Sequence, residues 1–185
     1  MENLTRVGIA TALLLSPALQ ANEKLHSFGL EIHNGTIDAA RTGATTELND
    51  TDSTHLILRY DYNFNKEFSL GLGYLDGDSS NFNSFFNLFT DSRLEYDALL
   101  VNAKYQFILS KRNRLFVQAS AIQYNYDIID NNAVVSSGED TDFGLAIGWA
   151  MKFDKGLGLG VGYNYLRLGS DIKIKTINFG INYSF

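Results

Sequence analysis

The sequence predicts an all-β fold, an eight-stranded antiparallel up-and-down transmembrane β-barrel. Apolar residues recur at every second position over most of the chain after Phe28, and a period of two is typical of a strand with one apolar face. The 13 phenylalanines and 10 tyrosines favour strands over helices. Pro17 is the only proline, so every later residue can donate the backbone hydrogen bond that a closed sheet requires.

Residues 1–21 have the pattern of a secretory signal peptide. Arg6 precedes an uncharged apolar stretch, residues 7–15, which is shorter than the roughly 20 residues that a transmembrane helix needs. Ala21 is the small residue that precedes a signal cleavage site. We therefore expect export of the chain and one barrel domain over residues 22–185. A buried N-terminal helix is the alternative for this segment.

The first four strands follow from their apolar positions. In each strand, apolar residues alternate with small or polar residues, and the apolar set defines one face. The apolar sets span residues 28–32, 56–64, 68–74 and 99–107. The predicted strands that contain them are 25–35, 54–64, 67–76 and 94–109.

The second half of the chain continues this alternation, with one ambiguous strand. The predicted strand 114–127 has apolar residues on both faces between Leu115 and Tyr126, so the sequence leaves its inward face undetermined. In the next strands, glycine, alanine and asparagine stand opposite the apolar set. These strands are predicted at 141–153, 157–168 and 172–185.

The connections between the strands alternate in length. The long connections are 36–53, 77–93 and 128–140. The short connections are 65–66, 110–113, 154–156 and 169–171. Short turns at one end and longer loops at the other are the pattern of outer-membrane barrels. We therefore assign the short turns and both termini to the periplasmic side and the long loops to the extracellular side.

The character of the polar face decides whether the apolar face points outward. A soluble barrel such as a lipocalin has its apolar face inside and many charges outside. Here the polar face consists mainly of glycine, alanine, serine and asparagine, and only 19% of the chain is charged. Small residues suit the narrow, filled interior of an eight-stranded barrel. The apolar face should therefore contact lipid, with aromatic residues near the membrane interfaces.

A few charged residues fall on the inward face in this register. Both signs occur, and a buried charge without a partner costs several kcal/mol. We expect a salt-bridge network that plugs the barrel, and a gated ion path is the alternative. The residues of this predicted interior network are Glu31, Arg59, Asp61, Lys104 and Lys152.

The last strand carries a pattern that resembles a known signal. Its alternating residues resemble the assembly signal that the barrel-insertion machinery recognises in outer-membrane proteins: Ile177, Phe179, Ile181, Tyr183 and Phe185. Together with the eight strands and the export signal, they resemble the OmpA-type and OmpX-type barrel domains, without the periplasmic domain of OmpA. The resemblance implies the outer membrane of a Gram-negative bacterium. It also implies several alternative roles, namely envelope integrity, loop-mediated interaction, passage of small hydrophobic molecules or lipid A modification.

The histidines offer one hypothesis for catalysis. His33 and His55 should lie near the extracellular mouth, and Asp52 and Ser53 precede His55. A Ser/His/Asp set at that place could support acyl transfer, but no enzyme motif surrounds it. A His33–His55 metal pair lacks a third ligand, and the chain has no cysteine. We therefore expect no enzyme, no metal site and no cofactor.

The long loops are acidic. Asp38, Glu47, Asp50 and Asp52 lie in or beside the first loop, and five further carboxylates lie in residues 127–142. Clustered carboxylates could bind divalent cations shared with lipopolysaccharide phosphates, or they could form an ordinary solvated surface. Outer-membrane lipid and lipopolysaccharide are therefore the expected partners.

Other features bear on further partners. The formal charge of −6 and the pI near 5.0 argue against nucleic acid. A closed barrel has no free strand edge, which favours a monomer. One long loop is aromatic, and these rings could form an adhesive tip or lie at the membrane interface: Phe82, Phe85, Phe86 and Phe89.

Overall fold

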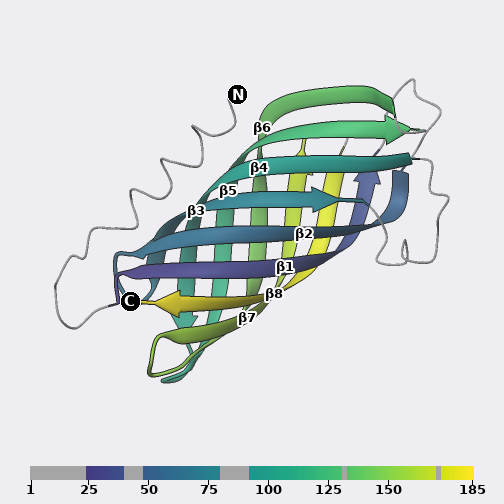
Figure 1. The fold of residues 1–185 in the computed structure, drawn as a ribbon. Coiled ribbons are helices and arrows are strands. Elements are labelled where there is room, and N and C mark those ends of the chain that lie inside the picture. Colours follow the sequence, from purple (N-terminus) through teal and green to yellow (C-terminus); the bar gives the residue numbers. More distant parts are fainter. Residues whose placement is uncertain (1–23, 40–47, 80–91, 131–132, 170–171) are drawn as a thin grey trace.

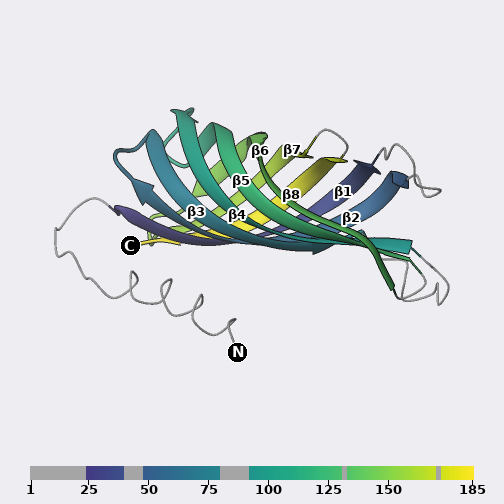
Figure 2. The same ribbon diagram turned by 90° about the horizontal axis from the view of Figure 1, so that it is seen from above.

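The computed structural model describes residues 24–39, 48–79, 92–130, 133–169 and 172–185. The predicted signal peptide and the aromatic loop lie outside these residues. Eight antiparallel strands pair in chain order, and the last strand pairs with the first to close the barrel (Figures 1 and 2). The predicted fold class is confirmed. The described residues contain no helix that is long and apolar enough to cross a membrane.

All eight predicted strands are present, but several are longer at the end that carries the long loops. The observed strands are β1 (His26–Ala39), β2 (Leu48–Asn63), β3 (Phe68–Asp78), β4 (Ser92–Ile108), β5 (Asn113–Asp130), β6 (Ala133–Lys152), β7 (Leu157–Leu168) and β8 (Ile172–Ser184). The assignment of residues 36–39, 48–53, 128–130 and 133–140 to loops was wrong. Their polar composition is typical of loops, but a strand outside the membrane can also carry polar residues on its outer face.

The ambiguous strand β5 has a definite inward face. Phe116, Ile122 and Tyr124 are buried inside the barrel, whereas Leu115 and Val117 are exposed on its outer surface. The glycine-rich inner faces of β6 and β7 make room for the ring of Phe116. A Cβ placed on Gly148 would lie 2.5 Å from Cζ of Phe116, and one on Gly162 would lie 3.1 Å from the same atom.

The polarity of both faces inverts along the barrel axis. In β8, Ile177 and Phe179 point outward and are 64% and 59% exposed, and the polar Asn178 between them points inward. Closer to the long loops, Ile174 points inward and is fully buried, while Lys173 and Lys175 point outward. An apolar outer face suits lipid and a charged one suits water, so this change marks the edge of the expected lipid-facing belt on the side of the long loops.

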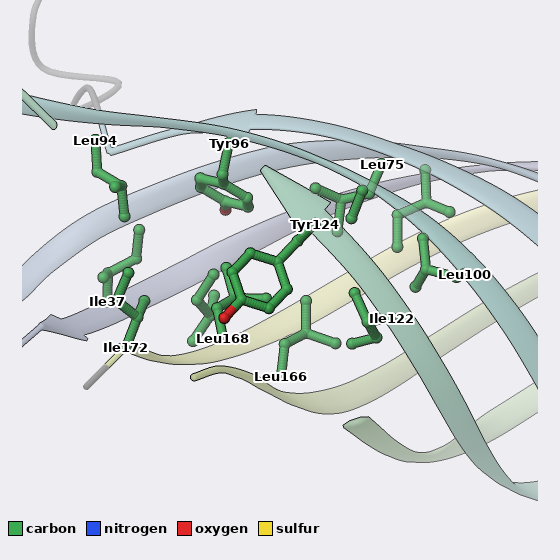
Figure 3. Packing of buried hydrophobic residues seen from close by; sticks show 13 residues of the cluster. Ile37, Leu75, Leu94, Tyr96, Leu100, Ile122, Tyr124, Leu166, Leu168 and Ile172 are labelled. Atoms are coloured by element: carbon green, nitrogen blue, oxygen red, sulfur yellow. The ribbon is translucent and has the colours of Figure 1, made fainter. Parts of the chain in front are cut away.

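The inverted part of the barrel has an apolar core of its own, which we call the apolar cap. Its side chains converge from seven strands onto Tyr96 and Tyr124 (Figure 3). The lumen therefore has two zones, a polar zone at the level of the membrane and an apolar zone above it. The buried residues of the apolar cap are Ile37, Ile57, Leu75, Leu94, Tyr96, Ala98, Leu100, Ile122, Tyr124, Leu166, Leu168, Ile172 and Ile174.

Candidate functional site

Four of the five predicted interior charges lie together in the polar zone. Arg59 pairs with Glu31, and its Nε lies 3.4 Å from Oδ2 of Asp61. The Nζ of Lys104 lies 2.9 Å from the same Asp61 oxygen. The side chains come from β1, β2 and β4, and each is only about a tenth exposed. Two acids and two bases balance, so this lumen charge cluster carries no net formal charge.

Neutral side chains extend the cluster to further strands. Asn178 on β8 donates to Glu31 over 3.3 Å, and Arg59 donates to Oε1 of Gln118 on β5 over 2.9 Å. The cavity beside these groups measures about 40 Å³, which accommodates no more than a few water molecules. At this level the described side chains fill the lumen.

Lys152 differs from the other predicted interior charges. It lines the same small cavity as Lys104 and Asp61, yet it makes no ion pair within 4 Å with any residue that the structure describes. The inward position of Lys152 follows from its place on β6, but the sequence pattern did not reveal that it lies beyond the reach of a carboxylate. That the charged residues act as a plug stays a prediction.

The two candidate catalytic histidines lie at the boundary between the two zones. His33 and His55 are buried, and their rings stack with centroids 4.4 Å apart. His33 Nε2 lies 3.1 Å from Oε2 of Glu31, and His33 Nδ1 lies 3.2 Å from the hydroxyl of Thr176. His33 therefore belongs to the lumen charge cluster, whereas His55 faces the apolar cap.

The structure does not assemble the hypothetical Ser/His/Asp set. Asp52 is exposed on the outer face, whereas Ser53 is fully buried inside. Ser53 Oγ lies 2.8 Å from the hydroxyl of Tyr96, and this hydroxyl lies 2.9 Å from Nδ1 of His55. Tyr96 therefore separates the serine from the histidine. Sequence reasoning missed Tyr96, although its inward position could have been inferred from the alternation in β4.

The outer wall of the extracellular part carries an acidic groove of about 540 Å³. Asp76 on β3 stands directly opposite Asp97 on β4, and both border the groove together with Asp127 on β5. Like charges directly opposite each other destabilise a sheet. No group of three His, Asp or Glu side chains converges on a metal-sized site within the described part of the chain.

One strand edge is not covered by another described strand. Pairing between β6 and β7 runs only from Gly144 to Lys152, so residues 133–143 of β6 pair with β5 alone. The backbone N–H groups of Thr141 and Phe143 instead donate to the side chains of Asp140 and Asp142, over 2.7 and 2.8 Å. The barrel is closed, but this stretch of β6 has no described strand on one side, and the two aspartate side chains cap its backbone N–H groups. That the protein is a monomer stays a prediction.

The predicted assembly signal lies on the outer face of β8. Its five residues are 45–64% exposed, and inward residues such as Asn178 and Ser184 alternate with them. Phe185 also stacks on His26 with centroids 5.8 Å apart. This geometry presents an apolar ridge to lipid. Recognition by the insertion machinery stays a prediction.

Comparisons with known proteins agree with this geometry. The profile of the family described as outer membrane protein beta-barrel domain matches residues 7–185. Neisserial surface protein A has a similar structure, with a TM-score of 0.69 and 10% identity over 86% of this chain and 97% of that chain. Ail, the attachment invasion locus protein of Yersinia pestis, has a TM-score of 0.56 and 16% identity over 86% of this chain and 98% of that chain. No curated protein sequence matches this chain.

Proposed function

Because this chain belongs to the outer membrane protein beta-barrel domain family, we propose that it is a non-catalytic barrel with a sealed lumen that supports the outer membrane. In this role, its charged outer wall contacts lipopolysaccharide. The observation that carries the proposal is the inversion of polarity. Polar side chains fill the lumen at the level of the apolar belt, and the apolar cap fills it above that level. The outer wall around the apolar cap is charged.

Basic side chains occupy one sector of this wall. Arg167 on β7 and Lys173 on β8 are register partners, and Lys175 follows on the same face of β8. They lie above Ile177, next to the apolar belt, where they would face the lipid phosphates. Arg167 pairs with Asp142 at 3.5 Å and Lys175 with Asp38 at 2.9 Å. The Asp142 side chain is only 12% exposed, whereas Lys175 and Asp38 are 45% and 33% exposed. Exposed ion pairs such as Lys175–Asp38 are worth only about 0–1 kcal/mol, so phosphate groups can compete for Lys175.

Carboxylates occupy the opposite sector, around the acidic groove. Asp76 and Asp97 face each other across β3 and β4. Divalent cations shared with lipopolysaccharide phosphates would relieve their repulsion, because hard cations prefer oxygen ligands. The wall would thereby contact lipopolysaccharide directly on one side and through cations on the other.

Two other roles fit the structure less well. A conduit for hydrophobic molecules needs a continuous apolar path. Here the lumen charge cluster lies below the apolar cap on the barrel axis, so buried charged side chains interrupt such a path. Lipid A modification needs an accessible nucleophile, but Ser53 is fully buried and its hydroxyl bonds to Tyr96.

Binding of labelled lipopolysaccharide to the refolded barrel tests the proposal. We expect Lys173→Gln with Lys175→Gln to weaken binding several-fold, and a chelator of divalent cations to weaken it further. Lys155→Gln in the short turn between β6 and β7 is the matched control and should bind like the wild type. Unchanged lipopolysaccharide binding by the double variant would show that Lys173 and Lys175 do not contact lipopolysaccharide. Steady single-channel conductance of the wild type in a planar bilayer would overturn the sealed lumen.

A second role, in surface interaction, is favoured by the β5–β6 hairpin. Val134 and Val135 lie near its tip, outside the proposed lipid-facing belt, and are 59% and 56% exposed. Exposed apolar side chains of this kind mark contact surfaces. If they bind a partner at the cell surface, Val134→Ser with Val135→Ser should reduce attachment to host cells, while lipopolysaccharide binding stays unchanged. Equal attachment of both proteins would reject this role.

A further inference from the structure

The end of the barrel with the short turns contains a basic cavity of about 230 Å³, which we call the basic vestibule. Segments that are far apart in the sequence form its walls, including the chain before β1, the β2–β3 and β4–β5 turns and the ends of β5 and β6. Five of its lining residues are cationic and only one is acidic: Lys24, Lys66, Lys111, Arg114 and Lys152, with Asp154.

The single carboxylate does not balance the cations deeper in the vestibule. Asp154 lies at the exposed rim, 3.7 Å from Lys111 and 3.4 Å from Arg112. Lys152 lines both the vestibule and the small lumen cavity above it. The carboxylate on that side, Asp61, already pairs with Arg59 and Lys104.

Arg114 is a second cation of the vestibule that has no ion pair with a described residue. Its Nη1 donates to the backbone carbonyl of Lys66 over 2.6 Å, which fixes the guanidinium beside the vestibule. Its Nε is buried and has no hydrogen-bond partner in the part of the chain that the structure describes. Buried donors are nearly always satisfied in folded proteins, by protein, water or an ion, so Arg114 is a polar group that the described residues leave partly unsatisfied.

We propose that the basic vestibule binds the phosphate group of a periplasmic anion. Lys152 Nζ and the guanidinium of Arg114 donate to its oxygens, and Lys24 and Lys66 contribute positive charge at the entrance. Phosphate fits these donors, because arginine recognises it through several hydrogen bonds and lysine as a point charge. The volume leaves space for a substituent on the phosphate, such as a glycerol. Both a phospholipid headgroup and a soluble phosphate ester have this chemistry.

Titration of the refolded protein in detergent with inorganic phosphate, at constant ionic strength, tests the site. We expect saturable binding that Lys152→Met and Arg114→Gln each weaken at least about tenfold, which corresponds to about 1.4 kcal/mol. Lys155→Met changes a neighbouring exposed lysine that does not line the vestibule. It should bind phosphate like the wild type.

Folding and ligand source are controlled separately. Heat-modifiable migration on an SDS gel shows which variants fold. If Lys152→Met does not fold, the binding of phosphate to Arg114→Gln decides the test. Backbone amide shifts of Gly156 and Lys66 on phosphate addition locate the site in the wild type. In phosphatidylglycerol nanodiscs, loss of phosphate binding identifies the lipid headgroup as the ligand, and retained binding identifies a soluble ester. Absent binding, or equal affinity of the wild type and a folded Lys152→Met or Arg114→Gln variant, overturns the proposal.

Discussion

His33 and His55 stack at the boundary between the two zones of the lumen, with ring planes inclined by only 23°. His33 is hydrogen-bonded on both sides, to Glu31 and to Thr176. His55 bonds to Tyr96 through Nδ1, whereas its buried Nε2 has no partner among the described residues. The pair therefore joins a polar network to an apolar core, and we expect His33 to contribute more to stability than His55.

Replacing each histidine by phenylalanine tests whether the two rings contribute unequally to the free energy of unfolding. His33→Phe deprives Glu31 and Thr176 of a partner in the buried interior, and we expect it to lower the free energy of unfolding by about 1–3 kcal/mol. His55→Phe removes an unsatisfied nitrogen, and Tyr96 keeps its bond to Ser53, so its effect should be smaller. Urea unfolding in detergent, followed by the fluorescence of Trp149, measures both. A larger loss for His55→Phe would contradict the assignment.

The lumen charge cluster predicts a large effect for Arg59. Arg59→Met leaves Glu31 without its main partner and Asp61 with Lys104 alone, and breaking a buried pair costs about 3–5 kcal/mol. Arg112→Met is the matched control, because Arg112 pairs with Asp154 at 3.4 Å in an exposed position. It should cost less than about 1 kcal/mol. The same urea experiment decides, and equal stability of the two variants would show that the cluster does not hold the barrel together.

The apolar cap can be tested with two neighbouring residues of β8. Ile174 is fully buried, whereas Lys173 points outward. Ile174→Ala should lower the free energy of unfolding by about 2–5 kcal/mol because it leaves a cavity, and Lys173→Ala should change it by less than about 0.5 kcal/mol. If the extracellular part were a loose set of loops, both changes would be small.

The sequence predicted the membrane-level half of the barrel better than the extracellular half. Alternation alone placed Glu31, Arg59 and Lys104 on one face, because side chains in strands alternate strictly. Only the outermost segments, such as residues 133–140, differ from the predicted strands, because carboxylates such as Asp140 are typical of loops. The inverted alternation of Lys173, Ile174 and Lys175 was visible in the sequence. Contacts between strands, such as that of Tyr96 with His55, depend on the register.

The protected edge of β6 predicts a change in oligomeric state. Asp140→Ala with Asp142→Ala frees the N–H groups of Thr141 and Phe143, and an unprotected strand edge invites pairing with a second copy. We expect dimers or larger species in light scattering after size-exclusion chromatography in detergent. Asp127→Ala on β5 removes a similar charge without exposing the edge, and it should remain like the wild type. A double variant with the mass of the wild type would show that these caps do not protect the edge.

The close approach of Phe116 to β6 predicts different effects for two glycines of the inner face. A Cβ on Gly148 would lie 2.5 Å from the Phe116 ring and 2.4 Å from the carbonyl oxygen of Val161, whereas one on Gly160 would meet nothing closer than 3.7 Å. Gly148→Ala should therefore lower the free energy of unfolding by about 1–3 kcal/mol through overpacking. Gly160→Ala should be neutral or raise it by about 0.4–1 kcal/mol, because alanine restricts the unfolded chain. Adding Phe116→Leu to Gly148→Ala should restore part of the lost stability, since the smaller side chain leaves space for the new methyl group. Equal unfolding curves for the two alanine variants would contradict the packing of Phe116 against Gly148.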